Sequence, residues 1–114
     1  MIVRFWSART SELRCHAYLE HFDRSVLPKL REFKGYVGVM TLTREADGQV
    51  EILVLTVWRS LEAIQQFAGP DIEAAIVAEE AAALLTDFDR RVRHFEVVST
   101  GQPAGSFITP LESC

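Results

Sequence analysis

The spacing of hydrophobic residues changes along the chain between the period of a strand and that of a helix. Residues 2–8 alternate, with Val3 and Phe5 on one side and Arg4 and Trp6 on the other, which predicts a first strand. A stripe of apolar residues at steps of three or four then predicts a long helix with one buried face, formed by Cys15, Leu19, Phe22, Val26, Leu30 and Phe33. Thr10 or Ser11 is expected to cap this helix and Pro28 to interrupt it.

Two β-rich segments follow, residues 35–45 and 49–58, and they flank the dipeptide Asp47-Gly48. Because both positions of this dipeptide tolerate positive φ, it is a strong hairpin signal. The second arm is apolar without alternation, which is typical of a strand that is buried on both faces.

The last third of the chain predicts two more helices and a strand. Ser60 is expected to cap a helix that ends at Gly69-Pro70, and Asp71 to begin another, in a segment rich in strong helix formers. A strand is expected over 90–98, and residues 99–114, with turn residues and little periodicity, are expected to form an irregular arm.

The resulting order, β-α-β-β-α-β, is typical of the ferredoxin-like α+β fold, with a four-stranded antiparallel sheet and helices on one face. Residues 1–98 are expected to form this domain. The opposite face of the sheet is also apolar, and a large exposed apolar patch marks an interaction surface. A symmetric homodimer, packed sheet against sheet with a small-molecule cavity between the sheets, is therefore expected.

Composition removes several classes of partner. The 114 residues carry a net charge of −4 and no basic run, which argues against nucleic acid and against an anionic membrane. No apolar run approaches the ~20 residues of a membrane span, and no secretory signal is evident, so a cytoplasmic location is expected. Two cysteines are too few for a disulfide framework and lack ligand spacing, and no phosphate-binding loop is present.

Four segments together resemble the antibiotic biosynthesis monooxygenase family of dimeric α+β barrels: MIVRFWSART, VWRSLEAIQQFAG, DIEAAIVAEEAAALL and VRHFEVV. The resemblance implies the fold and the dimer, in a superfamily of cofactor-free monooxygenases, haem-degrading enzymes and isomerases. Haem-degrading members use Asn, Trp and His at places where this chain has Trp6-Ser7, Phe67 and Val77, and the chain contains no Asn.

The first and last strands are antiparallel neighbours in this fold, and one register places Arg4 opposite Glu96 and Trp6 opposite His94. If these side chains face a cavity, His94 is a candidate general base and Arg4 a candidate anion-stabilising residue, with Trp6 as an apolar wall. The structural alternative is an Arg4–Glu96 ion pair beside a His94–Trp6 stack.

The other candidate substrate-binding residues are aromatic or soft apolar side chains: Trp58, Tyr18, Tyr36 and Met40. For Trp58, a role as an aromatic plug between sheet and helix is favoured. Glu12, His16 and Glu20 share one helix face, but a solvated ion-pair face is favoured over a metal site, so neither metal nor cofactor is expected.

These observations favour a cofactor-independent monooxygenase that acts on a small aromatic or quinol-like compound. One alternative is a non-catalytic dimeric barrel that binds a small hydrophobic ligand. Another is a haem-binding protein with His94 as the axial ligand.

Overall fold

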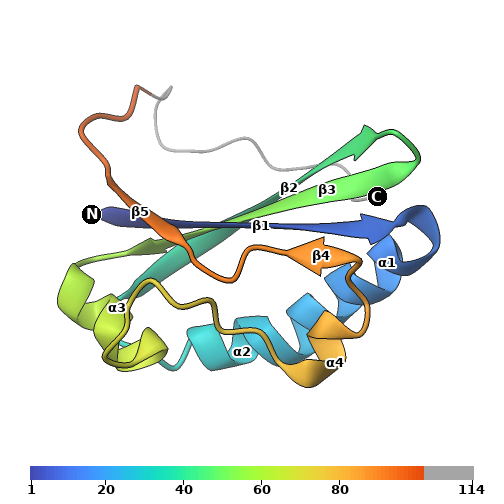
Figure 1. Ribbon diagram of the computed structural model, residues 1–114. Helices are drawn as coiled ribbons and strands as arrows, with labels where there is room; N and C mark the ends of the chain where they lie inside the picture. Colours follow the sequence, from blue (N-terminus) through green and yellow to red (C-terminus); the bar gives the residue numbers. More distant parts are fainter. Residues whose placement is uncertain (102–114) are drawn as a thin grey trace.

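The computed structural model describes residues 1–101, which form one antiparallel sheet covered on one face by helices (Figure 1). The expected arm over 99–114 falls mainly outside the described residues. In chain order the elements are β1 (Ile2–Ser11), α1 (Glu12–His21), the π-helical turn η1 (Phe22–Val26), α2 (Leu27–Leu30), β2 (Tyr36–Ala46), β3 (Gln49–Trp58), α3 (Leu61–Ala68), α4 (Glu79–Ala82), β4 (Asp87–Phe88) and β5 (Arg93–Glu96).

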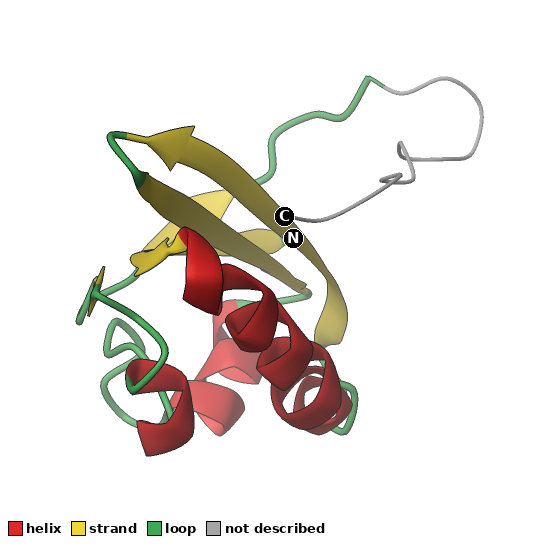
Figure 2. Ribbon diagram, turned by 90° about the vertical axis from the view of Figure 1, so that its right-hand side faces the viewer, coloured by secondary structure: helices red, strands yellow, loops and turns green. Residues whose placement is uncertain are grey.

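The sheet has the expected ferredoxin-like order. β2 pairs with β3, β3 with β1, and β1 with both β4 and β5, all antiparallel. Figure 2 shows the helices on the same side of this sheet. Asp47 and Gly48 both adopt positive φ, 53° and 77°, at the tip of the β2–β3 hairpin, as their sequence predicts.

The first helical segment is capped and interrupted as its sequence predicts. The Ser11 hydroxyl accepts the Arg14 amide at 3.2 Å, and the chain passes from α1 through η1 into α2, where Pro28 lies in the first turn. The predicted stripe faces the sheet, with Cys15, Phe22 and Leu30 almost fully buried. Together with Trp58, Ile52 and Ile64 these side chains form the core between the sheet and the helices.

The helix predicted to begin at Asp71 is wrong. Residues 71–78 are not helical, and only Glu79–Ala82 forms a short α4. Backbone groups of this segment have other partners: the Ala75 amide donates to the Arg90 carbonyl and the Glu73 carbonyl accepts the Val92 amide. Tertiary hydrogen bonds therefore override the strong helix propensity of the segment.

The last strand is shorter than predicted, and its register differs by two residues. The strand expected over 90–98 is limited to β5, and β4 forms a separate pairing with β1 at Ala8 and Arg9. Arg4 lies opposite His94, and Ile2 lies opposite Glu96. The expected pairs Arg4–Glu96 and Trp6–His94 are therefore wrong.

The two faces of β3 differ within the single chain, in which only one of the two faces predicted to be buried is covered. Its helix-facing residues are buried, whereas Leu53, Leu55 and Val57 on the other face remain partly exposed. By strand pairing, this open face continues through Phe5 on β1 and Met40 on β2. One face of the sheet is thus left apolar and uncovered by the described residues of this chain.

Candidate functional site

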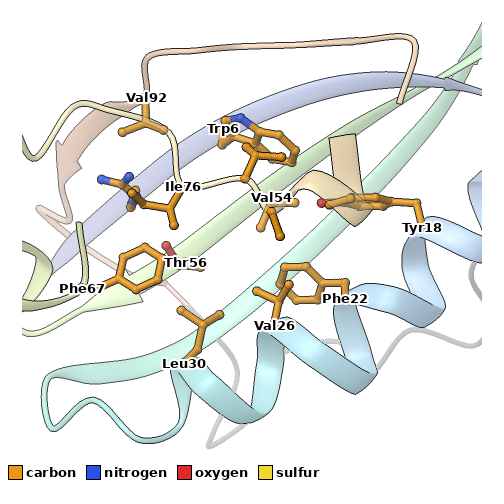
Figure 3. A pocket seen from close by; sticks show the side chains of 14 residues that line it. Trp6, Tyr18, Phe22, Val26, Leu30, Val54, Thr56, Phe67, Ile76 and Val92 are labelled. Atoms are coloured by element: carbon orange, nitrogen blue, oxygen red, sulfur yellow. The ribbon is translucent and has the colours of Figure 1, made fainter. Parts of the chain in front are cut away.

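A pocket lies between the sheet and the helices of a single chain (Figure 3). Its volume is about 80 Å³, room for roughly five to eight water molecules or one small ring compound. The walls are largely apolar, and only a few of the lining residues have polar side chains. The lining consists of Arg4, Trp6, Tyr18, Phe22, Val26, Leu30, Val54, Thr56, Phe67, Ile76, Val77, Ala78, Ala81 and Val92.

The position of this pocket corrects the expectation that the candidate residues face a cavity between two sheets. Arg4 and Trp6 are on the helix-facing side of β1, where Arg4 is only 5% exposed and Trp6 packs on Tyr18 of α1. The open face of the sheet lies on the other side. The pocket and any sheet-to-sheet interface are therefore on opposite faces.

Arg4 is a buried cation on the wall of this pocket. Its Nη1 donates to the Ile72 carbonyl and its Nη2 to the Ala74 carbonyl at 2.7 Å. The guanidinium also lies over the Phe67 ring, 5.6 Å from the centroid. Burial lowers the pKa of Arg4 to about 10, so the group is still charged at neutral pH. Among residues 1–101 no carboxylate forms an ion pair with it.

The segment that replaces the predicted second helix builds this site. Ile72 and Ala74 can offer their carbonyl oxygens to Arg4 because neither oxygen is used in a helix. The exposed Arg91 side chain fixes the same segment by a two-pronged contact with Asp71, at 2.7 and 3.1 Å. The contact with Arg91 lowers the pKa of the Asp71 carboxyl.

His94 lies behind Arg4 and does not line the pocket. Its Nε2 is 3.0 Å from the Arg4 Nη1. Because a guanidinium can only donate, Nε2 must accept, and the ring proton is on Nδ1. Burial, followed by the positive charge of Arg4, lowers the pKa of His94, whereas Glu73 opposes this shift. His94 is thus placed to hold the guanidinium rather than to take a proton from a molecule in the pocket.

Trp6 and Tyr18 line the pocket, as their candidate roles require. The Trp6 Nε1 donates to the Asp89 carbonyl at 2.8 Å, and its ring lies 6.4 Å from the Tyr18 ring and 6.2 Å from the Phe88 ring. These contacts hold the indole as a fixed wall. Tyr18 is 3% exposed, and burial raises the pKa of its phenol well above the usual value, so it is neutral.

The other sequence-based candidates lie elsewhere. Trp58 is fully buried in the core behind Phe67, 5.4 Å from its ring, and donates from Nε1 to the Thr56 hydroxyl at 2.8 Å. This position is that of the aromatic plug. Tyr36 packs edge-on against Trp58, and Met40 is 43% exposed on the open face of the sheet. None of the three lines the pocket.

Several pocket residues were not among the predicted ligand-binding residues. Phe22, Val26 and Leu30 appear in the sequence only as the buried stripe of the first helix. Their spacing signals burial, and nothing in it separates packing against the sheet from lining a cavity. Phe67 and Val77 do line the pocket, at the places that the family resemblance indicated.

The described residues offer no ready metal site. Within residues 1–101 no group of three or more His, Cys, Asp or Glu side chains is arranged to hold a metal ion. On α1, His16 and Glu20 form an exposed contact of 3.2 Å, whereas Glu12 lies near Glu45, which raises the pKa of the Glu12 carboxyl. No helix in the described part is long and apolar enough to cross a membrane.

Comparison with known proteins identifies the fold. No family model and no curated protein matches the sequence. A solved structure of MhuD, a haem degrader from Mycobacterium tuberculosis with two haems bound in its active site, has a TM-score of 0.57 and 26% identity, over 90% of this chain and all of that one. A Bacillus cereus protein described as a candidate antibiotic biosynthesis monooxygenase has a TM-score of 0.61 and 19% identity, over 90% and 97%.

A dimeric ferredoxin-like protein from an uncultured marine organism is also similar, with a TM-score of 0.55 and 17% identity over 90% of this chain and 98% of that one. Identities this low establish a common fold and leave the reaction open. The chain therefore has the fold of the antibiotic biosynthesis monooxygenase-like proteins, as the four sequence segments predicted.

Proposed function

We propose that this protein is a cofactor-independent monooxygenase that oxidises a small aromatic, quinol-like compound in the pocket of each chain. The observation that carries the proposal is the Arg4 guanidinium, which is 5% exposed and lies on an apolar wall with no described carboxylate to neutralise it. A buried charge is costly unless an opposite charge accompanies it, so the pocket favours an anionic guest.

Arg4 would bind the substrate as its phenolate. An adjacent positive charge in an apolar environment lowers the pKa of a bound phenol, and the proton is released to solvent. The electron-rich ring then reacts with O₂. One oxygen atom becomes a quinone carbonyl on a ring carbon, which loses its hydrogen, and the other leaves as water. The substrate supplies all four electrons, so no separate reductant is required.

His94 would act through Arg4. Its Nε2 and the Ile72 and Ala74 carbonyls fix the guanidinium from behind, which leaves the remaining N–H groups for the pocket. The candidate role of His94 as the general base requires its lone pair, which this contact already uses. A positioning role therefore agrees better with the geometry.

Haem, which MhuD degrades, does not match this pocket. No histidine, cysteine or methionine lines it, and the phenol of Tyr18 is held neutral by its raised pKa, which makes it a poor iron ligand. His94, the candidate axial ligand, is outside the pocket with Nε2 facing Arg4. A volume of about 80 Å³ is also far below the ~300 Å³ at which pockets for large ligands begin.

Simple binding of a small hydrophobic anion, without catalysis, is the second candidate. It is favoured by one specific observation: the titratable groups on the pocket wall are Arg4 and Tyr18, and both carry their protons at neutral pH. A reaction that needs a general base within the pocket would therefore lack one.

We also propose that the protein is a homodimer through the open face of its sheet. Met40, Leu42 and Phe95 on this face are each at least 40% exposed, and Leu53 and Leu55 lie between them. A second copy would cover this apolar surface symmetrically. The dimeric ferredoxin-like structure with the same fold supports this arrangement.

Oxygen uptake tests the catalytic proposal. Purified protein without added cofactor is mixed with hydroquinones and other single-ring phenols, and O₂ consumption is followed with an electrode. We expect turnover that falls at least tenfold in Val54→Phe, because Val54 lines the pocket and a phenyl ring there fills the space. Leu13→Phe, at a 93% exposed site on α1, is the control and should retain activity.

No uptake with any compound, or uptake that Val54→Phe leaves unchanged, would contradict the monooxygenase proposal. Melting temperatures of both variants separate loss of activity from loss of folding.

A further inference from the structure

A second polar group in the pocket has no protein partner. The Tyr18 hydroxyl makes no hydrogen bond with any described residue, and its oxygen is open to the pocket although the residue as a whole is only 3% exposed. A phenol O–H in a largely apolar pocket is most stable when a bound molecule or a water molecule accepts its hydrogen bond. Figure 3 shows the Tyr18 oxygen directed into the pocket, where a bound molecule or water can meet it.

The two polar groups lie toward opposite ends of the pocket. Arg4 contacts Phe67, and Figure 3 shows Phe67 and Tyr18 on opposite sides with Val54 between them. On β1, Trp6 follows Arg4 on the same face, and its ring lies 6.4 Å from the Tyr18 ring. An aromatic guest that packs on Trp6 would therefore have the cation toward one end and the phenol toward the other.

A third hydrogen-bonding group supports the cationic end. Thr56 is the cross-strand neighbour of Arg4, and both line the pocket. The Thr56 oxygen already accepts the Trp58 Nε1–H at 2.8 Å, so its own O–H is free to donate. Arg4 and Thr56 together offer donors suited to an anionic oxygen, whereas the opposite end offers one neutral phenol.

We propose that the pocket selects small aromatic monoanions that carry a second oxygen at the far end of the ring, and that Tyr18 recognises this second oxygen by a hydrogen bond. The anionic oxygen of a carboxylate or phenolate lies at Arg4 and Thr56, the ring packs against Trp6, and the distal hydroxyl or carbonyl pairs with the Tyr18 O–H. This inference rests on the proposed pocket and defines its substrate class. It makes Tyr18 a specificity-determining residue.

Calorimetric titration with matched ligands tests this selection. The probes are 4-hydroxybenzoate and benzoate, which differ by the distal hydroxyl, and the neutral amides of both acids. We expect the wild-type protein to bind 4-hydroxybenzoate about three- to tenfold more tightly than benzoate, the range of one net hydrogen bond. We expect the amides to bind at least tenfold more weakly than the acids, because they lack the charge that Arg4 requires.

The decisive variant is Tyr18→Phe, with Tyr36→Phe as its control. Tyr18→Phe removes only a hydroxyl without a protein partner, so the protein should fold with an unchanged or higher melting temperature. In Tyr18→Phe the preference for 4-hydroxybenzoate should disappear while the affinity for benzoate changes less than twofold. Tyr36→Phe, a partly buried phenol outside the pocket, should keep the preference.

Four results would each overturn the inference. They are no binding of any of the four compounds, no preference for the distal hydroxyl, a preference that survives in Tyr18→Phe, and amides that bind as tightly as the acids. The binding pattern without oxygen uptake would refute the monooxygenase proposal and leave this inference intact. Oxygen uptake that depends on the pocket, without this binding pattern, would refute the inference about Tyr18 and leave the monooxygenase proposal intact.

Discussion

Arg4 shows how a single residue takes its role from partners that are remote in the sequence. Its guanidinium contacts backbone oxygens 68 and 70 positions away and a histidine 90 positions away. The sequence alone shows that Arg4 places a positive charge on the first strand. Burial and the absence of a described acidic partner turn this charge into an anion site.

His94 provides a prediction at the same scale. Its pKa is lowered in the folded protein, first by burial and then by Arg4, with Glu73 acting in the opposite direction. Below about pH 6.5, His94 in the unfolded chain binds a proton, whereas His94 in the folded protein does not yet bind one. Stability should therefore fall as the pH drops from about 6.5 through the lower folded-state pKa.

His94→Gln should remove this component, because an amide oxygen can still accept from Arg4 but does not titrate. The measurement is urea unfolding between pH 8 and pH 5. His16→Gln, at an exposed site on α1, is the matched control and should keep the wild-type slope. An unchanged slope in His94→Gln would show that the contact with Arg4 does not govern this titration.

At the scale of elements, a close approach joins the loop after α2 to helix α3. A Cβ atom added at Gly35 would lie 2.1 Å from the Cβ of Ala63, nearer than any real contact. The Gly35 carbonyl also accepts the Arg59 amide at 2.9 Å, which ties this loop to the end of β3. Glycine is therefore required here by space.

Gly35→Ala should destabilise the fold by about 1–3 kcal/mol through overpacking. Ala63→Gly alone should cost about 1 kcal/mol of helix propensity. The double variant should be less destabilised than the sum of the two, because Ala63→Gly removes the Cβ atom that an alanine at position 35 would strike. Urea unfolding measures all three, and Gly38→Ala, with nothing within 4 Å of its added Cβ, is the control. If the losses of unfolding free energy in the two single variants were simply additive, the close approach to Ala63 would not be the reason that position 35 requires glycine.

Elements also differ in how well their sequences specify them. The Ser11 and Ser60 caps, the interruption near Pro28 and the Asp47-Gly48 turn depend on local chemistry, and each forms as predicted. The segment over 71–78 has a strong helical composition and is not helical. Its backbone groups bond to Arg4 and to residues 90–92, and no local pattern records these partners.

For the whole molecule, the proposed homodimer predicts that the open face of the sheet is the contact surface between two copies. Leu55 lies on β3 at the middle of this face, opposite Phe5 on one neighbouring strand and Met40 on the other. If two copies pack there, a charge at this position would be buried without a partner, at a cost of several kcal/mol.

Leu55→Arg should therefore weaken dimerisation at least 100-fold and yield a monomer at micromolar concentration, as measured by light scattering after size exclusion. Leu13→Arg, at an exposed apolar site on the helical side, should leave the dimer intact. A monomeric wild-type protein, or a dimer that survives Leu55→Arg, would contradict the proposed interface.

Local patterns in the sequence predict the main strands, their topology and the buried helix stripe, because periodicity, caps and turn residues act over a few positions. The same patterns predict that β1 pairs with the last strand. Long-range contacts set the register of that pair, the side of the sheet on which Arg4 and Trp6 lie, and the irregular path of residues 71–78. These features depend on which distant groups satisfy one buried guanidinium, and a shift of two residues in register preserves every local pattern while it changes the partner of each side chain.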